Sequence, residues 1–362
     1  MNSPATLTLR LRIVATMLVM AATVSSLAHA VVAAERPSSE RPGFERRNTE
    51  QLTPGARASP DDGNVWVVSC RHLSAAQARE AAPGELKFWR LQANQWHVSD
   101  ATDFVTTADH TPVFTIYVHG NQVDMGTAKS TARRVACILG LDDPHVGGEL
   151  IAFTWPAGRV AGGPLNDVRV KATRSDCYGP ALAQFISTLP ADAIVNVIGH
   201  SYGARLAAVA FDDLATRQPA RSGPVRGVLL GAAMSNNWLL PGMRCGDAMP
   251  YVESMLVTTN QSDRVLHWYP LLWGLHSRGP QALGDTGLAC RAQLGDDLTK
   301  YHSINVTCPV GKSHDWRDYV ADARVRQAIR QLMSVPTGKL SSNDRGSPSP
   351  WQCRRRPSSR RA

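Results

Sequence analysis

A glycine-framed serine, placed directly after a buried apolar run and directly before a helical stretch, constrains this chain most. Residues 194–198 read Ile-Val-Asn-Val-Ile, residues 199–203 read Gly-His-Ser-Tyr-Gly, and an apolar stretch of helical character follows over 204–215. A turn this tight from strand to helix strains the backbone of its central residue and leaves no room for side chains two positions before and after it. The spacing therefore predicts that Ser201 projects above a sheet edge at a helix N-terminus, where developing negative charge is favoured.

Short apolar runs alternate with helical stretches through the middle of the chain. The predicted buried strands are residues 113–118, 150–154, 194–198, 227–230, 254–258 and, more weakly, 303–307. Residues 65–69 form a further strand, and 86–98 a pair of more amphipathic ones. Helices are predicted over 127–139, 180–189, 204–215 and 316–333. Strands that alternate with helices predict an α/β class with a parallel, doubly wound sheet.

The two ends of the chain differ in composition from its middle. Of the formal net charge of +9, +6 lies in residues 336–362 and +2 in residues 1–50, which leaves +1 for the rest. Because a nucleic-acid-binding fold normally carries its basic stripe on the folded body, no nucleic-acid partner is expected. We expect a signal peptide (1–30), a disordered linker (31–62), one folded domain (63–335) and a basic disordered tail (336–362).

The first thirty residues have the pattern of a secretory signal peptide. Arg10 and Arg12 precede an uncharged apolar run over 13–27, and residues 28–30 read Ala-His-Ala, an A-x-A cleavage site. The run is shorter than the ~20 residues that a membrane span needs, and no later segment has the length or purity to span. We expect export to the periplasm or the exterior after cleavage near Ala30, and no stable membrane span.

Seven cysteines lie in the part expected to be exported. They are Cys70, Cys137, Cys177, Cys245, Cys290, Cys308 and Cys353. Export permits disulfides, and the odd number leaves at least one thiol unpaired or paired between chains. Cys245 and Cys290 flank loops late in the chain and are the pair we expect first.

A serine hydroxyl is a weak nucleophile unless a base accepts its proton and an acid orients that base. In hydrolases with a glycine-framed serine turn the acid follows the serine in the chain, and the histidine follows the acid. Asp263 comes shortly after the predicted strand 254–258 and is the expected acid. Asp285 and Asp247 are the alternatives.

The expected base is His314, which follows the predicted strand 303–307 and precedes the closing helix. His302 lies before that strand, at the opposite sheet edge. His200 lies inside the serine turn, and we expect its side chain to point away from Ser201.

Backbone N–H groups are expected to stabilise the oxyanion that forms during acyl transfer. Each such donor contributes roughly 3–4 kcal/mol in known serine hydrolases. One expected donor is the amide of Tyr202. The loop after the predicted strand 113–118 begins with His119 and Gly120, and supplies a second donor from Asn121, or alternatively Gln122.

Four stretches resemble the α/β-hydrolase superfamily, and within it a little-characterised bacterial group of esterase- or lipase-like serine hydrolases. They are residues 116–121 (Ile-Tyr-Val-His-Gly-Asn), 153–156 (Phe-Thr-Trp-Pro), 199–205 (Gly-His-Ser-Tyr-Gly-Ala-Arg) and 311–314 (Gly-Lys-Ser-His). The resemblance covers about residues 64–335 and implies a mostly parallel central sheet with helices on both faces. It also implies a triad of Ser201, Asp263 and His314, but no particular substrate.

Several aromatic side chains follow the predicted strands and are candidates for lining a pocket. They are His119, Trp155, Trp238 and Trp268. The residues around Trp268 form either a mobile cap or a helix packed on the core. Arg205 either binds a substrate carboxylate or forms a structural salt bridge. No metal-binding or nucleotide-binding motif is found, so no metal site and no cofactor are expected.

Three functions are compatible with these residues. The first is hydrolysis of a small-molecule or lipid-like carboxylic ester through an acyl-Ser201 intermediate. The second uses the same triad in an acyltransferase, which passes the acyl group to an alcohol or glycan. The third is a non-catalytic binding protein of the cell envelope, whose basic tail contacts anionic polymers, since a fold alone does not confer activity.

Overall fold

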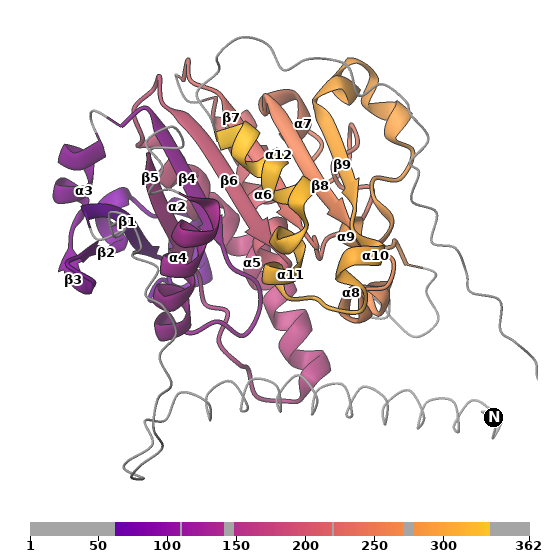
Figure 1. The fold of residues 1–362 in the computed structure, drawn as a ribbon, viewed down its shortest axis with the longest axis horizontal. Helices are drawn as coiled ribbons and strands as arrows, with labels where there is room; N and C mark the ends of the chain where they lie inside the picture. Colours follow the sequence, from indigo (N-terminus) through magenta and orange to yellow (C-terminus); the bar gives the residue numbers. More distant parts are fainter. Residues whose placement is uncertain (1–61, 109–110, 141–147, 219–220, 271–278, 334–362) are drawn as a thin grey trace, which may run out of the picture. The chain divides into compact units, whose positions relative to one another are not determined.

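The computed structural model describes residues 62–108, 111–140, 148–218, 221–270 and 279–333 (Figure 1). The expected signal peptide (1–30) and basic tail (336–362) lie outside these residues, as does the expected linker (31–62) apart from Asp62. These segments remain predictions.

Within the described residues, nine strands form one sheet in the order β3-β2-β1-β5-β4-β6-β7-β8-β9. They are β1 (Asp62–Ser69), β2 (Lys87–Gln92), β3 (Gln95–Ser99), β4 (Val113–Val118), β5 (Glu149–Thr154), β6 (Ile194–His200), β7 (Val225–Leu230), β8 (Ser254–Thr259) and β9 (Tyr301–Asn305). Only β2 runs antiparallel to its neighbours, β1 and β3. The central strands β4 to β7 are buried along their whole length, as parallel strands covered on both faces should be. The predicted mostly parallel sheet is confirmed.

The described helices surround this sheet. They are α2 (Ala75–Glu80), α3 (Ala101–Ala108), α4 (Met125–Leu139), α5 (Pro164–Ser187), α6 (Tyr202–Arg217), α7 (Ala248–Tyr251), α8 (Arg264–His267), α9 (Leu283–Thr286), α10 (Thr307–Val310), α11 (Trp316–Ala321) and α12 (Ala323–Met333). The described 3₁₀ helices include η1 (Pro83–Glu85) and η3 (Arg291–Lys300).

Each face of the sheet has its own apolar layer. On one face, side chains of α4, α11 and α12 pack with sheet residues such as Ile198 and Leu230. On the other face, Phe185 of α5 and Phe104 of α3 contact each other, with ring centroids 5.4 Å apart. Figure 1 shows α11 and α12 in front of the sheet and α5 and α6 behind it. The expected helices on both faces are confirmed.

Most predicted elements differ from the structure by one or more residues at their boundaries, and three of these differences have a local explanation. The predicted closing helix is two helices, because Asp322 takes an extended conformation and its Oδ1 accepts the amide of Arg324 at 2.8 Å, which starts α12. The last strand ends at Asn305 because its side chain accepts the amide of Thr307 at 2.9 Å in a turn. Helix α5 begins well before Pro180, which lies in its interior; the preceding turns are rich in charged residues and carry a weak apolar pattern.

The described residues divide into two compact units. The smaller contains Arg159–Val170, in which the amide of Val160 donates to Oδ1 of Asp167 at 2.6 Å. The sheet and every residue of the candidate site described below belong to the larger unit.

The expected disulfide between Cys245 and Cys290 is wrong. Both are free thiols, Cys245 buried and Cys290 exposed, and burial raises the pKa of the Cys245 thiol. Cys308, in contrast, is disulfide-bonded.

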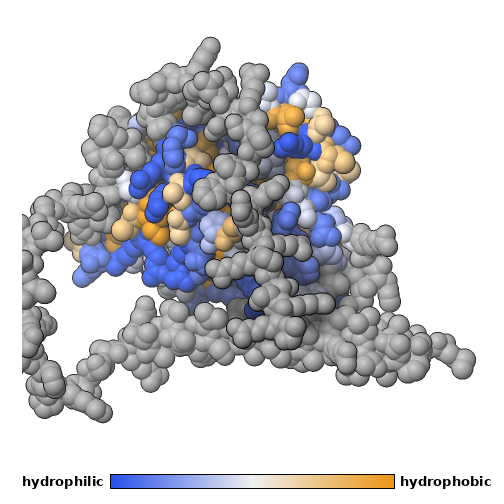
Figure 2. Space-filling model, turned by 45° about the vertical axis from the view of Figure 1, so that its right-hand side comes forward, coloured by the Kyte–Doolittle hydropathy of each residue, from blue (hydrophilic) through white to orange (hydrophobic). Residues whose placement is uncertain are grey.

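Hydrophilic residues cover most of the described surface on the face shown in Figure 2, with smaller hydrophobic groups between them. None of the helices in the described ranges has both the length and the apolar composition needed to cross a membrane.

Candidate active site

The serine turn has the strained geometry that its sequence predicts. Ser201 has φ 55° and ψ −119°, between the end of β6 and the first residue of α6. A Cβ on Gly203 would lie 2.1 Å from the Val118 carbonyl oxygen, and a Cβ on Gly199 would lie 2.6 Å from Cα of Ala204. Both glycines are therefore required by close backbone approach, and the positive φ of a buried serine marks a functional position.

The structure brings Ser201, His314 and Asp263 together in one hydrogen-bonded chain. Nε2 of His314 lies 2.8 Å from Oγ of Ser201, and Nδ1 lies 2.6 Å from Oδ2 of Asp263. Because an ionised carboxylate can only accept, Nδ1 carries the proton of a neutral imidazole. Nε2 is then the acceptor for the Ser201 hydroxyl, which is the orientation a general base needs.

Asp263 is fully buried and held by four donors. Its Oδ1 accepts the amides of Val265 and Leu266 at 2.9 and 3.1 Å, and the hydroxyl of Tyr319 donates to Oδ2 at 2.5 Å. Burial alone would raise the pKa of Asp263, but the interaction with His314 and these hydrogen bonds outweigh it and lower the pKa. Asp263 therefore stays ionised and can orient the imidazole.

The loop that carries His314 is fixed from two sides. The buried side-chain amide of Asn260 donates to the Gly311 carbonyl at 2.8 Å. Nε2 of His200 lies 2.9 Å from the His314 carbonyl oxygen, and the two imidazole centroids are 5.1 Å apart. Burial, followed by the neighbouring His314, lowers the pKa of His200 to about 3, so His200 donates to this carbonyl as a neutral ring. His200 thus contacts the base residue, which the sequence analysis did not foresee.

The alternative acids and bases occupy other places. Asp285 lies in α9 and Asp247 precedes α7; within the described residues neither forms a hydrogen bond or ion pair with His314. His302 lies within β9 and not before it, because this strand begins at Tyr301. Its side chain is exposed, and partial desolvation lowers its pKa. Of the acidic candidates, the geometry selects Asp263.

The loop of the expected oxyanion donors packs directly on the serine. A Cβ on Gly120 would lie only 3.0 Å from Cβ of Ser201. The amide of Gln122 donates to the Ala157 carbonyl at 2.9 Å and to Oδ1 of Asn121 at 2.8 Å. Those acceptors already engage the Gln122 amide, so Gln122 is poorly placed as an oxyanion donor. Asn121 and Tyr202 remain expected donors.

His119 and Trp155 support this loop from beneath. Both side chains are buried, their rings stack at a centroid distance of 6.0 Å, and the Trp155 indole donates to the His119 carbonyl at 2.9 Å. Burial lowers the pKa of His119 to about 4, which keeps the ring neutral. We expected both residues to line a pocket, but their burial makes them supports of the loop.

Trp238 lies between two arginines. The guanidinium carbon of Arg205 is 4.3 Å from its ring centroid and that of Arg244 is 4.9 Å away. Nε and Nη2 of Arg205 donate to the two carboxylate oxygens of Asp176 at 2.7 and 2.8 Å. Of the two roles expected for Arg205, the structure therefore supports the structural salt bridge.

Trp268 is half-buried beside His267, and residues 271–278 after it are outside the described part.

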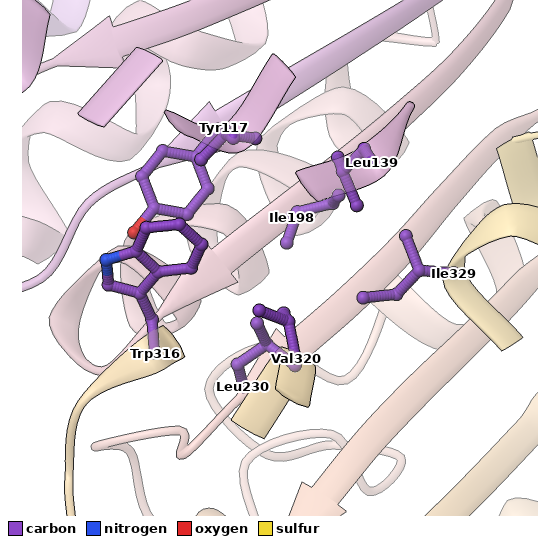
Figure 3. A pocket seen from close by; sticks show the side chains of 8 residues that line it. Tyr117, Leu139, Ile198, Leu230, Trp316, Val320 and Ile329 are labelled. Atoms are coloured by element: carbon purple, nitrogen blue, oxygen red, sulfur yellow. The ribbon is translucent and has the colours of Figure 1, made fainter. Parts of the chain in front are cut away.

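An apolar cavity lies between the sheet and helices α4, α11 and α12 (Figure 3). The rings of Tyr117 and Trp316 face each other at one end, with centroids 5.5 Å apart, and Ile329 lies at the other. None of the Ser201, His314 or Asp263 side chains lines it. The cavity is therefore part of the core beneath the site and not the place where a substrate meets Ser201.

Two residues of the site were missed by the sequence analysis. Tyr319 was assigned only to the closing helix, and Asn260 only to the segment before Asp263. The sequence signal for both was weak. Tyr319 is a tyrosine one turn into the helix that follows His314, and Asn260 is an asparagine directly after a strand. Their partners lie 56 and 51 residues away in the chain, which local patterns do not reveal.

The sheet order, the strained serine between β6 and α6, and the positions of the acid and histidine after later strands define an α/β-hydrolase. In agreement, residues 97–233 match the model of a family described as alpha/beta hydrolase of unknown function (DUF900). The described part of the chain therefore has an α/β-hydrolase fold, and residues 97–233 resemble this family. None of the curated proteins matches it in sequence.

Solved structures of esterases resemble this chain distantly. A thermostable carboxylesterase cloned from a metagenomic library is 12% identical over 70% of this chain and 84% of its own, with a TM-score of 0.37. An esterase of Pyrobaculum calidifontis is 14% identical over 69% and 81%, with a TM-score of 0.34. The catalytic core of acetyl xylan esterase from Trichoderma reesei is 13% identical over 62% and 97%, with a TM-score of 0.33. These similarities are too remote to indicate a substrate.

Proposed function

We propose that this protein is a serine hydrolase that cleaves carboxylic esters through an acyl-serine intermediate. The observation that carries the proposal is the hydrogen-bonded chain from Ser201 through His314 to Asp263, with distances of 2.8 and 2.6 Å. These three groups match the nucleophile, base and orienting acid of the serine hydrolase mechanism in role and geometry.

The proposed reaction has two halves. His314 accepts the proton of Ser201 as Oγ attacks the ester carbonyl, and the protonated imidazole then gives this proton to the leaving alcohol. In the second half His314 accepts a proton from water as the water oxygen attacks the acyl carbonyl. The imidazole then returns this proton to Oγ of Ser201 as the acyl–oxygen bond breaks and the acid leaves. The backbone amides of Tyr202 and Asn121 are the proposed donors to the oxyanion in both halves.

Activity-based labelling tests the proposal. A fluorophosphonate probe should label the purified protein, and Ser201→Ala should abolish both labelling and hydrolysis of p-nitrophenyl butyrate. Ser235→Ala is a matched control, because Ser235 is also buried but its hydroxyl lies 3.2 Å from Tyr269 and not beside a histidine. Labelling that persists in Ser201→Ala would refute the assignment of the nucleophile. Transfer of the acyl group to an added alcohol faster than to water would identify an acyltransferase instead.

We also propose that the protein is exported. The support is the sequence of the first thirty residues, with Arg10 and Arg12 before an apolar run and a cleavage site near Ala30. Mass spectrometry of the protein expressed with its natural N-terminus should find the mature chain in the exported fraction, starting near residue 31. Full-length protein retained inside the cell would contradict this.

A further inference from the structure

Arg71 lies at the same edge of the sheet as Ser201, because each residue follows the carboxyl end of a parallel strand. It follows β1, which pairs in parallel with β5 so that Ser69 lies opposite Thr154. Nη1 of Arg71 donates to Oγ1 of Thr154 at 3.0 Å and to the Trp155 carbonyl at 2.9 Å. β5 is two strands from β6 in the sheet, so the guanidinium lies on the order of 10 Å from Ser201, two interstrand spacings.

Contacts between loops tie Arg71 to the expected oxyanion loop. Oγ1 of Thr154, which accepts from Arg71, is also 2.8 Å from Nε2 of His119. His119 directly precedes Gly120, the residue packed against Ser201. Arg71 is therefore positioned by the same framework that positions the reacting serine.

The charge of Arg71 is not neutralised by an ion pair in the described part of the chain. Both acceptors of Nη1 are uncharged, and Nε and Nη2 have no acceptor among the described residues. Asp124 is the carboxylate whose charge acts on Arg71, but its Oδ1 accepts the Thr127 amide at 2.7 Å as the N-cap of α4. Partial burial lowers the pKa of Arg71.

A second guanidinium and an open space lie beside this group. Nη1 of Arg174, on α5, donates to the Pro156 carbonyl at 3.3 Å, and Arg174 likewise has no ion pair within the described ranges. A Cβ built on Gly158 would meet nothing nearer than Nη2 of Arg71 at 3.8 Å. Among the described residues there is thus room for a ligand atom next to Nη2 of Arg71.

We propose that Arg71, with Gly158 beside it, forms an anion subsite of the active site, and that the cleaved ester carries a carboxylate or similar anionic group on the order of 10 Å from its scissile carbonyl. The proposal rests on the proposed ester hydrolysis at Ser201. The planar guanidinium suits the two oxygens of a carboxylate. The Thr154 hydroxyl and the Trp155 carbonyl, both neutral, hold Nη1, so little side-chain freedom is lost on binding.

Paired substrates test this subsite. Mono-p-nitrophenyl esters of dicarboxylic acids are compared with neutral p-nitrophenyl esters of the same acyl length, such as suberate with octanoate. The quantity measured is the ratio of kcat/KM for the anionic ester to that for the neutral ester. Arg71→Gln should lower this ratio about tenfold or more, the effect of one hydrogen bond between charged groups. Acetate esters of hydroxy acids and of neutral alcohols test whether the anion lies on the alcohol part instead.

Two further variants separate charge from folding. Gly158→Val fills the space beside Nη2 without changing a charge and should lower the same ratio. Arg217→Gln is the matched control, since Arg217 lies in the last turn of α6 and its loss removes the same charge outside the site. Circular dichroism and thermal unfolding establish that each variant is folded. A ratio unchanged in both Arg71→Gln and Gly158→Val would overturn the subsite.

Calorimetry on an inactive protein separates the subsite from the proposed reaction. Ser201→Ala should bind suberate saturably, and adding Arg71→Gln should weaken this binding about tenfold or more. Suberate binding that depends on Arg71, without hydrolysis of any ester by the native protein, would leave the subsite standing and reject ester hydrolysis. Hydrolysis of both esters with no dependence on Arg71 would reject the subsite alone.

Discussion

The hydroxyl of Tyr319 lies 2.5 Å from Oδ2 of Asp263, the same carboxylate oxygen that accepts Nδ1 of His314. Oδ2 of the buried acid therefore accepts hydrogen bonds from the His314 imidazole and from the Tyr319 hydroxyl on α11. Oδ1 accepts two backbone amides. This arrangement keeps the carboxylate ionised without water and fixes the plane in which the imidazole lies.

Tyr319→Phe should lower kcat about tenfold with little change in KM, because it removes one hydrogen bond to the charged acid. It removes a donor that lowers the pKa of Asp263. The more basic carboxylate stabilises positive charge on the adjacent imidazole more strongly, so the acid limb of the kcat profile should move to higher pH. The measurement is kcat against pH with p-nitrophenyl butyrate.

Tyr178→Phe is the matched control for Tyr319→Phe. Tyr178 is also buried, and its hydroxyl donates at 2.5 Å to the Leu73 carbonyl, away from Asp263. It should leave the acid limb in place. An identical profile for Tyr319→Phe and the native protein would show that this hydroxyl does not tune the acid.

Gly203→Ala should lower the free energy of unfolding by roughly 1–3 kcal/mol, the range for overpacking in a rigid interior. The added Cβ would lie 2.1 Å from the Val118 carbonyl oxygen, so β4 and α6 must move apart. Urea unfolding measures the change. Gly84→Ala is the control, because no atom lies within 4 Å of its Cβ position and its stability should be nearly unchanged. Equal stability of the two variants would contradict the close approach.

Asp176→Asn should destabilise the protein by about 3 kcal/mol, because it leaves the buried guanidinium of Arg205 without its counter-charge. Arg205 is 2% exposed, and Asp176 is also the partner of Arg244 at 2.9 Å. Asp213→Asn breaks the more exposed pair with Arg217 and should cost less than about 1 kcal/mol. Thermal and urea unfolding measure the loss of stability in both variants. Equal losses would show that a buried ion pair contributes no more to stability here than an exposed one.

Glu149→Gln should change how stability depends on pH. Burial, opposed in part by the hydrogen bond from Trp66, raises the pKa of Glu149 to about 7. The folded protein therefore binds this proton more tightly than the unfolded chain, so the stabilising contribution is complete below about pH 4 and is lost as the pH rises through 7. The difference in free energy of unfolding between the variant and the native protein should be smallest at pH 5. Between pH 5 and pH 8 this difference should change in favour of the variant by on the order of 2 kcal/mol.

Urea unfolding at both pH values measures this difference for Glu149→Gln. Glu80→Gln provides the control, since Glu80 lies on the exposed surface of α2. It should shift stability little and equally at the two pH values. A constant difference between Glu149→Gln and the native protein from pH 5 to pH 8 would contradict a buried carboxyl that titrates in this range.

The sequence by itself determined the parts of this protein that depend on local backbone chemistry. Two glycines around Ser201 reveal a turn with no space for side chains. Runs of β-branched residues mark strands buried on both faces. Because parallel strands bring their carboxyl ends to one edge, the order of the strands also places Asp263 and His314 near the serine. Each glycine, strand or turn signal is contained within a few residues, so it depends on local backbone preferences alone.

Only the tertiary structure decided which side chains meet across the sheet edge. Ser201 and His314 are 113 residues apart, and the contacts of Tyr319, Asn260 and Arg71 join segments with no shared local pattern. The residue types of His119 and Trp155 do not decide whether they line a pocket or support a loop. Their burial in the tertiary structure shows that they support the expected oxyanion loop. The physical reason is that hydrogen-bond partners and exposure are set by packing between distant segments, whereas strand, turn and helix preferences are set within one segment.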